Sequence, residues 1–221
     1  MSRVVHKVRP LLEDLVFVGG AVMELYFTDP ASPRVRPTTD TDAICGVTTY
    51  VEYHRFGERL NELGFTQSAA ESDPPYRWTS GHEVLDVIPA GESVFGFSGR
   101  WHPEVLASAV WQDLEPGLSI RLARPEVLLA TKLEAHEDRG SDDPLASRDL
   151  EDIVVLIANR PELVDEVLSA AAPLRAWVRD RMRRHFPPSV VAELVAASLP
   201  EVRIVPDLLD TTLARIARLS G

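Results

Sequence analysis

Cysteine is almost absent from this chain of 221 residues, which has only Cys45. A single cysteine cannot form an intrachain disulfide and cannot build a thiolate-rich zinc site. The chain also has no Gly-x-Ser-x-Gly elbow and no P-loop motif. These absences exclude a disulfide scaffold and argue against a P-loop NTPase, and we expect Cys45 to pack in a strand.

Long apolar runs are missing as well, and no stretch approaches the length needed to cross a bilayer. The first residues, MSRVVHKVRPLLEDLVF, lack the apolar core and the small-residue cleavage site of a signal peptide. We therefore expect a cytoplasmic protein without a membrane partner. Its 45% hydrophobic content is sufficient for a sizeable core.

Lysine is scarce, since Lys7 and Lys132 are the only lysines among 23 basic residues. The formal net charge of -11 argues against a generally cationic nucleic-acid binder, although a local basic face is compatible with it. An ammonium is a point charge and a guanidinium is a planar fork, so the two are not interchangeable at a phosphate. Lys132 is thus a candidate phosphate contact, with chance retention as the alternative.

The first half of the chain reads as mixed α/β structure. We expect helices at residues 3–15, 21–27 and 49–65, and strands at residues 16–20, 40–47, 76–80 and 83–89. The last two strands are joined by Gly81 and His82, which suits a hairpin.

The second half reads as helices from about residue 100 onward. They are expected at residues 102–110, 124–139, 147–160, 162–186, 189–199 and 208–219. The sequence therefore predicts an α/β core at residues 1–95 and a mainly helical C-terminal region at residues 96–221.

Two aspartates in the stretch RPTTDTDAICG are separated by one residue. On a strand, Asp40 and Asp42 would point to the same side. Asp86 lies inside the apolar strand EVLDVIP, where an unpaired carboxylate would be costly to bury. Three carboxylates on neighbouring strands would suit Mg²⁺. The alternatives are that the first pair only turns the chain, and that Asp86 faces water.

The strand before these aspartates ends in two glycines, Gly19 and Gly20. Glycines at a strand end allow backbone N–H groups to approach a phosphate closely. Together with the three aspartates, they favour a site for a metal and a nucleotide.

These motifs resemble the nucleotidyltransferase superfamily, which has the polymerase-β-like fold. The shared features are a strand ending in VGG, the stretch RPTTDTD matching R-x-T-x-D-x-D, and a third aspartate in a later strand. The stretch RPEVLLATKLEAHEDRG, followed by SRDLEDIVVLI, is similar to AbiEii-type toxin nucleotidyltransferases. The resemblance spans about residues 16 to 157.

The resemblance implies an α+β fold, in which a polymerase-β-like mixed sheet with helices is followed by a C-terminal helical bundle. It implies that Asp40 and Asp42 bind Mg²⁺ or Mn²⁺, with Asp86 completing the metal site or acting as the base. Further roles are implied at Gly19 and Gly20 with the triphosphate and at Lys132 with the phosphates. The positions of Arg36, Arg139, Asp149 and Asp152 also match the family, with less defined functions, and Arg36 and Asp149 are predicted to take part in nucleotide binding. Ala21 departs from the family, which often has serine or threonine near the second glycine.

Lys132 also has a structural alternative. Lys132, His136 and Arg139 would lie on one face of a helix, while Asp149 and Asp152 would share a face of the next. Salt bridges between the two helices could explain all four charged residues. We favour that explanation for Arg139 and Asp152, and a phosphate contact for Lys132. His136 is interpreted as structural.

An RNA-binding face is a further hypothesis. Arg175, Arg179 and Arg183 recur one helical turn apart in PLRAWVRDRMRRHF. These arginines would contact RNA phosphates, or they would form a solvated face that pairs with acids elsewhere.

The sequence thus predicts an enzyme that transfers a nucleoside monophosphate from an NTP to an acceptor hydroxyl. By resemblance the acceptor would be the tRNA 3′ end, and the protein would be a toxin with a cognate antitoxin. The alternatives are an enzyme that modifies a protein or a small molecule such as an aminoglycoside, and a catalytically silent relative that binds a nucleotide or a partner.

Overall fold

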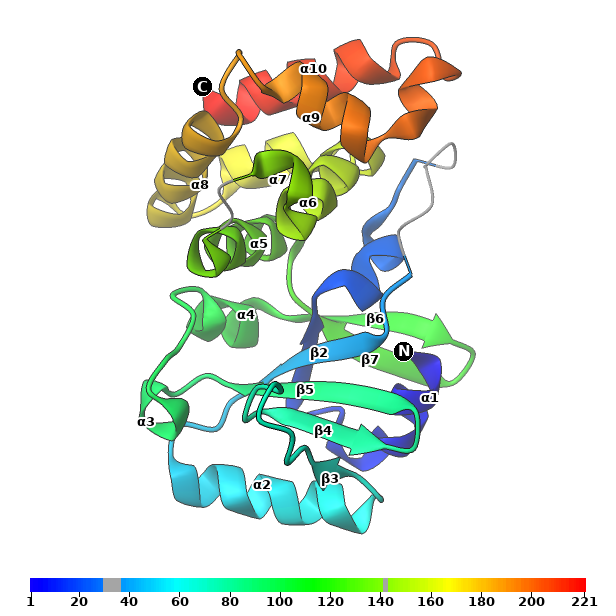
Figure 1. Ribbon diagram of the computed structural model, residues 1–221, viewed down its shortest axis with the longest axis vertical. Coiled ribbons are helices and arrows are strands. Elements are labelled where there is room, and N and C mark those ends of the chain that lie inside the picture. The colour runs from blue at the N-terminus through cyan, green and yellow to red at the C-terminus, as the bar shows by residue number, and fades with distance from the viewer. Residues whose placement is uncertain (30–36, 141–142) are drawn as a thin grey trace. The chain divides into compact units, whose positions relative to one another are not determined.

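The computed structural model describes residues 1–29, 37–140 and 143–221, and the chain forms two compact units (Figure 1). The α/β unit contains residues 1–22 and 37–124. The helical unit contains residues 23–29, 125–140 and 143–221. Each unit has its own buried core and is described separately.

The α/β unit is built on one seven-stranded sheet with the order β3-β4-β5-β2-β1-β7-β6. Its strands are β1 Leu15–Val18, β2 Asp40–Cys45, β3 Thr66–Gln67, β4 Arg77–Ser80, β5 Glu83–Pro89, β6 Val110–Glu115 and β7 Leu118–Leu122. β2 pairs with β5 and β1 pairs with β7 in parallel, and the other neighbours are antiparallel. The sheet is therefore mixed.

Strand β1 is buried at all four of its residues, as expected for the apolar run LVFV near the middle of a sheet. The hairpin of β4 and β5 forms as predicted, with Ser80 opposite Glu83. Gly81 supplies the positive φ of +66° in its turn. This turn fixes which residues face each other further along the two strands.

Helices complete the α/β unit. They are α1 Ser2–Lys7, α2 Tyr50–Glu62, α3 Glu92–Phe95 and α4 His102–Ser108, with 3-10 helices at Arg9–Leu11 and, crossing between the units, Gly20–Tyr26. α2 begins with a capping box, in which Thr49 and Glu52 satisfy each other's backbone N–H groups. A Cβ on Gly57 would lie 2.7 Å from the Trp78 ring, so glycine lets α2 approach β4 closely.

The sequence analysis assigned no strand to the segment where β6 and β7 form an antiparallel hairpin. Four of the six β6 residues are exposed and the strand contains a register shift, so it lacks the apolar alternation that marks a half-buried strand. As a result the sheet continues to Leu122 and the change to helices comes at Pro125, later than the predicted boundary near residue 95.

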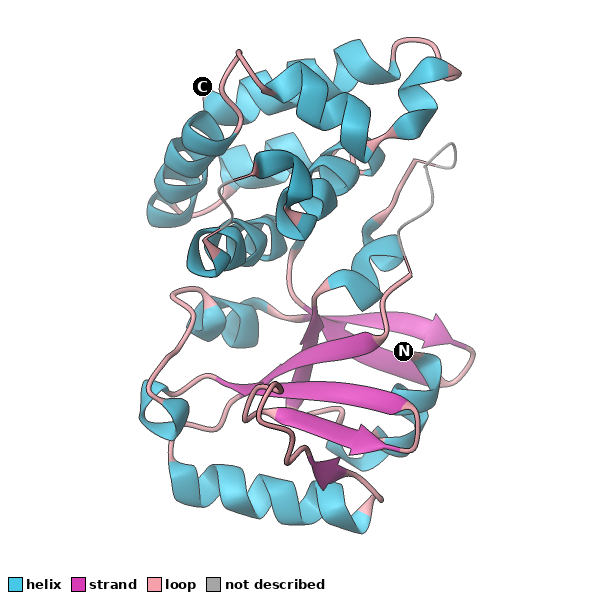
Figure 2. Cartoon of the chain, in the orientation of Figure 1, coloured by secondary structure: helices cyan, strands magenta, loops and turns pink. Residues whose placement is uncertain are grey.

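The helical unit consists of helices joined by short loops (Figure 2). They are α5 Pro125–Arg139, α6 Arg148–Asn159, α7 Leu163–Ser169, α8 Ala172–His185, α9 Val191–Ser198 and α10 Leu208–Ser220, with 3-10 helices at Pro144–Ala146 and Pro200–Arg203. α6 is buried along almost all of its length, and the Ser147 hydroxyl caps it by accepting from the Leu150 N–H.

One predicted helix, at residues 162–186, is divided in the structure into α7 and α8. Pro173 lies in the first turn of α8, where its missing N–H costs nothing, and Ala170 and Ala171 have extended backbone. The prediction of a mixed sheet with helices followed by a helical region, an α+β chain, is confirmed. Among the described residues, no helix has the length and apolar character needed to span a membrane.

Candidate active site

The register of two strands, β2 and β5, brings the predicted acidic residues together in the α/β unit. Asp42 on β2 lies directly opposite Asp86 on the parallel strand β5. Asp40 precedes Asp42 by two residues on the same strand, so alternation of side chains places all three on one face. Trp78, which packs on α2, faces the opposite side from its neighbour Arg77. The acids therefore lie on the face that α2 does not cover.

Gly19 ends strand β1 beside Asp42. Its φ is +79°, and a Cβ built on it would overlap the carboxylate of Asp42. Both the backbone conformation and the space therefore require glycine at this position. The structure thus places the paired glycines next to an acidic residue, as the sequence motif suggested.

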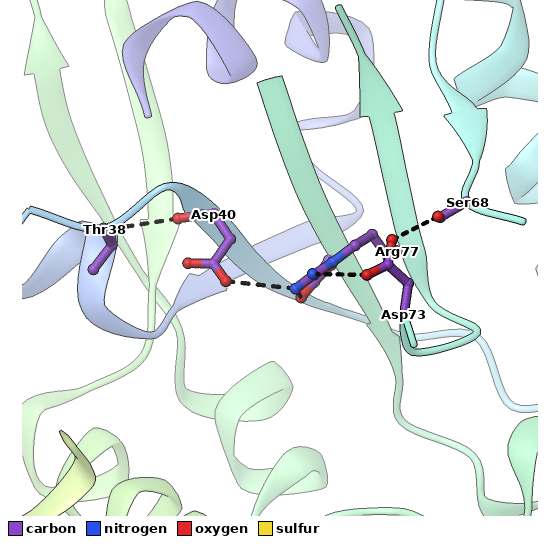
Figure 3. Close-up of polar contacts among 6 residues, drawn as sticks. Thr38, Asp40, Ser68, Asp73 and Arg77 are labelled. Carbon is purple, nitrogen blue, oxygen red and sulfur yellow. Dashed lines mark hydrogen bonds and ion pairs between the residues drawn. The ribbon is translucent and has the colours of Figure 1, made fainter. Parts of the chain in front are cut away.

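Arg77 on β4 lies among these acids, and the sequence analysis did not identify it. Its Nε donates to Asp86 Oδ1 at 2.8 Å and its Nη2 donates to Asp86 Oδ2 at 2.7 Å. The same Nη2 lies 3.5 Å from Asp40 Oδ2, while Nη1 lies 3.4 Å from Asp73 Oδ1. Figure 3 shows the guanidinium between Asp40 and Asp73. We name Arg77, Asp40, Asp73 and Asp86 the Arg77 cluster.

The Arg77 cluster explains how Asp86 is buried in an apolar strand. The bidentate pair with Arg77 supplies the partner that a buried carboxylate requires. Hydrogen bonding to Asp86 raises the pKa of Arg77 above its ordinary value, because it favours the charged form. Asp73, which also contacts the guanidinium of Arg77, is itself held by the Ser68 hydroxyl, which donates to its Oδ2 at 2.6 Å.

The sequence contained a signal for Arg77. Residues 77 and 86 are equidistant from the two-residue turn at Gly81 and His82, so the predicted hairpin places them opposite each other. Combining that register with the need of Asp86 for a partner would have identified the arginine.

The three aspartates suit a divalent cation in type, since carboxylate oxygens are the ligands that Mg²⁺ prefers. Their register on one face also suits a shared ion. Within the part of the chain that the structure describes, however, no three acidic, histidine or cysteine side chains gather closely enough to hold a metal ion. In this arrangement both oxygens of Asp86 accept hydrogen bonds from Arg77.

Lys132 lies in the helical unit, on α5. Its Nζ donates to Asp152 Oδ2 at 2.6 Å and lies 3.5 Å from Asp149 Oδ1. Asp149 also pairs with Arg139. These contacts join α5 to α6, as the salt-bridge alternative for Lys132 described. The role of Lys132 and Asp149 toward a nucleotide stays a prediction.

His136 lies on the same helix and is buried. Its Nδ1 is 2.8 Å from the Ser147 hydroxyl, and its ring meets that of His185 edge-on at 4.7 Å between centroids. Burial, followed by the nearby His185, lowers the pKa of His136. These contacts fit the structural interpretation of His136.

The three arginines of the predicted RNA face lie on α8. Arg175 donates to the carbonyl oxygens of Leu168 and Ala170 at 2.9 and 3.3 Å. Arg183 donates to the carbonyl oxygens of Ser220 and Gly221 at 2.6 and 2.8 Å. Two of the three thus bind backbone within the helical unit, whereas Arg179 is exposed. Arg36, predicted to lie near the nucleotide, is outside the described residues.

Comparisons with known proteins give distant similarities only. No family model and no curated protein matches the chain. The chain is similar to the crystal structure of JHP933 from Helicobacter pylori, with 15% identity, a TM-score of 0.43, and coverage of 97% of this chain and 88% of that one. A protein from H. pylori assigned as a nucleotidyltransferase has 16% identity and a TM-score of 0.43, with coverage of 97% and 90%.

A third structure is that of ANT(2″)-Ia in complex with adenylyl-2″-tobramycin. It has 15% identity and a TM-score of 0.43, covering 83% of this chain and 97% of that chain. The function of the present chain has to be argued from its own residues.

Proposed function

We propose that the chain is a nucleotidyltransferase that moves a nucleoside monophosphate from an NTP to an acceptor hydroxyl with the help of Mg²⁺ or Mn²⁺. The observation that carries this proposal is the placement of Asp40, Asp42 and Asp86 on one face of the sheet, with Gly19 against Asp42. This is the arrangement that the resemblance to the polymerase-β-like fold implies.

The chain's residues have distinct roles in this proposal. Asp40, Asp42 and Asp86 would hold the cation, which when bound would offset the charge of the phosphates and orient them. Gly19 and Gly20 leave the backbone accessible beside Asp42, where a phosphate could approach the amide groups. Arg77 holds the Asp86 carboxylate in place through two hydrogen bonds before substrate binds.

The reaction balances without any further co-reactant. The acceptor oxygen forms a bond to the α-phosphorus, and the bond from that phosphorus to the bridging oxygen of the β-phosphate breaks. Pyrophosphate leaves with the electron pair of the broken bond, and the hydroxyl proton passes to a base. Asp86 is the predicted base, and each of its oxygens keeps a lone pair beside the hydrogen bond that it accepts from Arg77.

An RNA acceptor such as the tRNA 3′ end, and with it a toxin role and a cognate antitoxin, rests on the family resemblance and on α8. Since Arg175 and Arg183 bind backbone carbonyls, exposed Arg179 is the sharpest probe. If it contacts RNA phosphate, Arg179→Glu should lower the slope of log affinity against log salt by roughly 0.7 to 0.9.

The experiment that tests the proposal is a transfer assay with each α-labelled NTP, Mg²⁺ or Mn²⁺, and three kinds of acceptor. Total RNA and a panel of aminoglycosides should be compared, with the purified protein autoradiographed as a third acceptor. Label on one acceptor, dependent on the cation, is the expected result. Failure to label any acceptor with any NTP would contradict the proposal and favour a silent nucleotide-binding or partner-binding relative.

A further inference from the structure

The Arg77 cluster sets one positive charge against three carboxylates. The guanidinium makes its two shortest contacts to Asp86, and longer ones to Asp40 and Asp73. One guanidinium cannot neutralise three acids, so the cluster keeps an excess of negative charge that favours a further cation.

The guanidinium also uses the oxygens that a cation would need. Both oxygens of Asp86 accept hydrogen bonds from Arg77, and one oxygen of Asp40 lies within ion-pair distance of it. A cation bound to Asp86 and Asp40 would lie close to the guanidinium, and repulsion between the two positive charges would weaken the contacts that Arg77 makes with these oxygens. Arginine and cation therefore compete for the same ligands.

Asp73 provides a place to which the guanidinium can move. It lies four residues before Arg77, outside the sheet, with its Oδ1 already 3.4 Å from Nη1. The Ser68 hydroxyl fixes its other oxygen, so the carboxylate keeps its orientation when Arg77 changes partners. Figure 3 shows Asp73 and Asp40 on either side of the guanidinium.

We propose that Arg77 is a built-in counter-ion that competes with a divalent cation for Asp86 and Asp40, and that Asp73 receives the guanidinium when the cation binds. Arg77 is thus a positioning residue that sets the cation affinity of the site. This inference rests on the proposed function, because it concerns the same acidic face. It goes further by assigning control of cation binding to a residue pair outside the predicted metal ligands.

The test is Mn²⁺ binding to the full chain without nucleotide, measured from the electron paramagnetic resonance signal of free Mn²⁺. Arg77→Gln should bind Mn²⁺ about tenfold more tightly than the wild type, because it removes a positive charge next to the ligands. Arg77→Lys should give a smaller gain, since it keeps the charge but loses the bidentate geometry. Arg77→Lys also provides the test of Mn²⁺ binding if Arg77→Gln does not fold.

The matched control is Arg59→Gln. Arg59 lies in the same unit and pairs with Asp14 at 2.8 Å, on a surface that contains none of the three acids. Its removal changes the net charge equally and should leave the Mn²⁺ affinity within about twofold. A gain in the control as large as that in Arg77→Gln would overturn the proposal.

A double-mutant cycle tests the role of Asp73. Asp73→Asn should weaken Mn²⁺ binding in the wild type, because the released guanidinium loses its second anchor. In the Arg77→Gln background the same change should have at most about half that effect on a logarithmic scale, since the arginine is gone. An equal effect in both backgrounds would show that Asp73 acts by its own charge and would overturn its assigned role.

The outcomes separate this inference from the proposed function. If wild-type Mn²⁺ binding is lost in Asp42→Asn while Arg77→Gln binds no more tightly than the wild type, the proposed function stands and competition by Arg77 is wrong. If neither the wild type nor Arg77→Gln binds Mn²⁺, competition by Arg77 is wrong, and the transfer assay decides the proposed function separately.

Discussion

The two units each contain a cluster in which one basic side chain faces several carboxylates, and the two clusters differ in exposure. In the helical unit, the side chains of Lys132, Asp149 and Asp152 are only 11%, 3% and 7% exposed. In the α/β unit, Arg77 is 24% exposed and Asp40 is 39% exposed. The Lys132 cluster is closed and joins two helices, whereas the Arg77 cluster is accessible to a ligand. Similar ion pairs can therefore serve different purposes.

The largest expected effect on stability comes from replacing Lys132, the cation of the closed cluster. Lys132→Met should lower the free energy of unfolding by about 3 to 5 kcal/mol, because Asp152 is left buried without a cation and Asp149 keeps only its pair with the exposed Arg139. Arg77→Met should cost less, about 2 to 3 kcal/mol, because Asp86 is left buried without its partner while Asp40 and Asp73 remain partly exposed to solvent. Urea unfolding of both variants measures the difference.

Arg139→Met is the control for the helical unit, because Arg139 also pairs with Asp149 but its side chain is 67% exposed. A stability loss of less than about 1 kcal/mol is expected there. If Lys132→Met proved equally mild and instead weakened NTP binding, the closed cluster would be functional, and the predicted phosphate contact of Lys132 would be supported.

A smaller effect on stability should follow from Gly19→Ala, which tests the close approach of Gly19 to Asp42. The alanine would adopt an unfavourable φ of +79° and collide with the Asp42 carboxylate, so a loss of about 1 to 3 kcal/mol is expected. Gly117→Ala is a matched control, because Gly117 has a φ of +80° but nothing within 4 Å of its added Cβ. The excess loss in Gly19→Ala, measured by urea unfolding, reports the contact with Asp42. Equal losses would contradict it.

Salt should also distinguish the two clusters. Raising NaCl from 0.05 to about 1 M shortens the range of exposed charge interactions to about 3 Å, whereas buried pairs are screened much less. The stability difference between the wild type and Arg77→Met should therefore shrink by about half, while that for Lys132→Met should persist. If the stability difference between the wild type and Arg77→Met did not change with salt, the Arg77 cluster would be as shielded from solvent as the Lys132 cluster.

The smallest expected effect concerns pH, and each unit offers one histidine. Burial lowers the pKa of His102 in the α/β unit and of His136 in the helical unit. The unfolded chain then binds the proton more readily, so both histidines contribute stability above the ordinary histidine pKa of about 6.5 that is lost as pH falls below it. Melting curves from pH 7.5 to 5 measure how much stability the protein loses as the pH falls. His102→Gln and His136→Gln should each make this loss of stability smaller by a few tenths of a kcal/mol to about 1 kcal/mol. An unchanged loss would contradict these pKa directions.

Sequence reasoning was most successful where pattern and local chemistry agree. The apolar strand before Gly19, the strand that begins at Asp40 and the hairpin at Gly81 were all predicted. The alignment of Asp42 with Asp86 also requires the parallel pairing of β2 with β5, which no local pattern in the sequence predicts. It failed for β6, because an edge strand exposed to solvent does not need alternating apolar residues. Arg77 was missed because its importance comes from cross-strand pairing rather than from a motif.

The helical unit shows a different limit. The helix positions of Lys132 and Asp152 were predicted from periodicity, but whether the two side chains meet depends on how α5 packs on α6. The sequence therefore left the salt bridge and the phosphate contact as alternatives. Packing of α5 on α6 forms the salt bridge, and only binding measurements can test the phosphate contact.

The most direct test of the central claim is release of pyrophosphate from NTPs, with the acceptor found in the transfer assay, as Mg²⁺ is titrated. Three proteins should be compared: the wild type, Asp42→Asn, and Asp113→Asn, which alters an aspartate on the edge strand β6 that accepts from the Ser119 hydroxyl at 2.6 Å. We predict cation-dependent release by the wild type and Asp113→Asn, and a rate at least about 100-fold lower in Asp42→Asn with a similar melting temperature. Release by folded Asp42→Asn at a rate near that of the wild type would contradict the account.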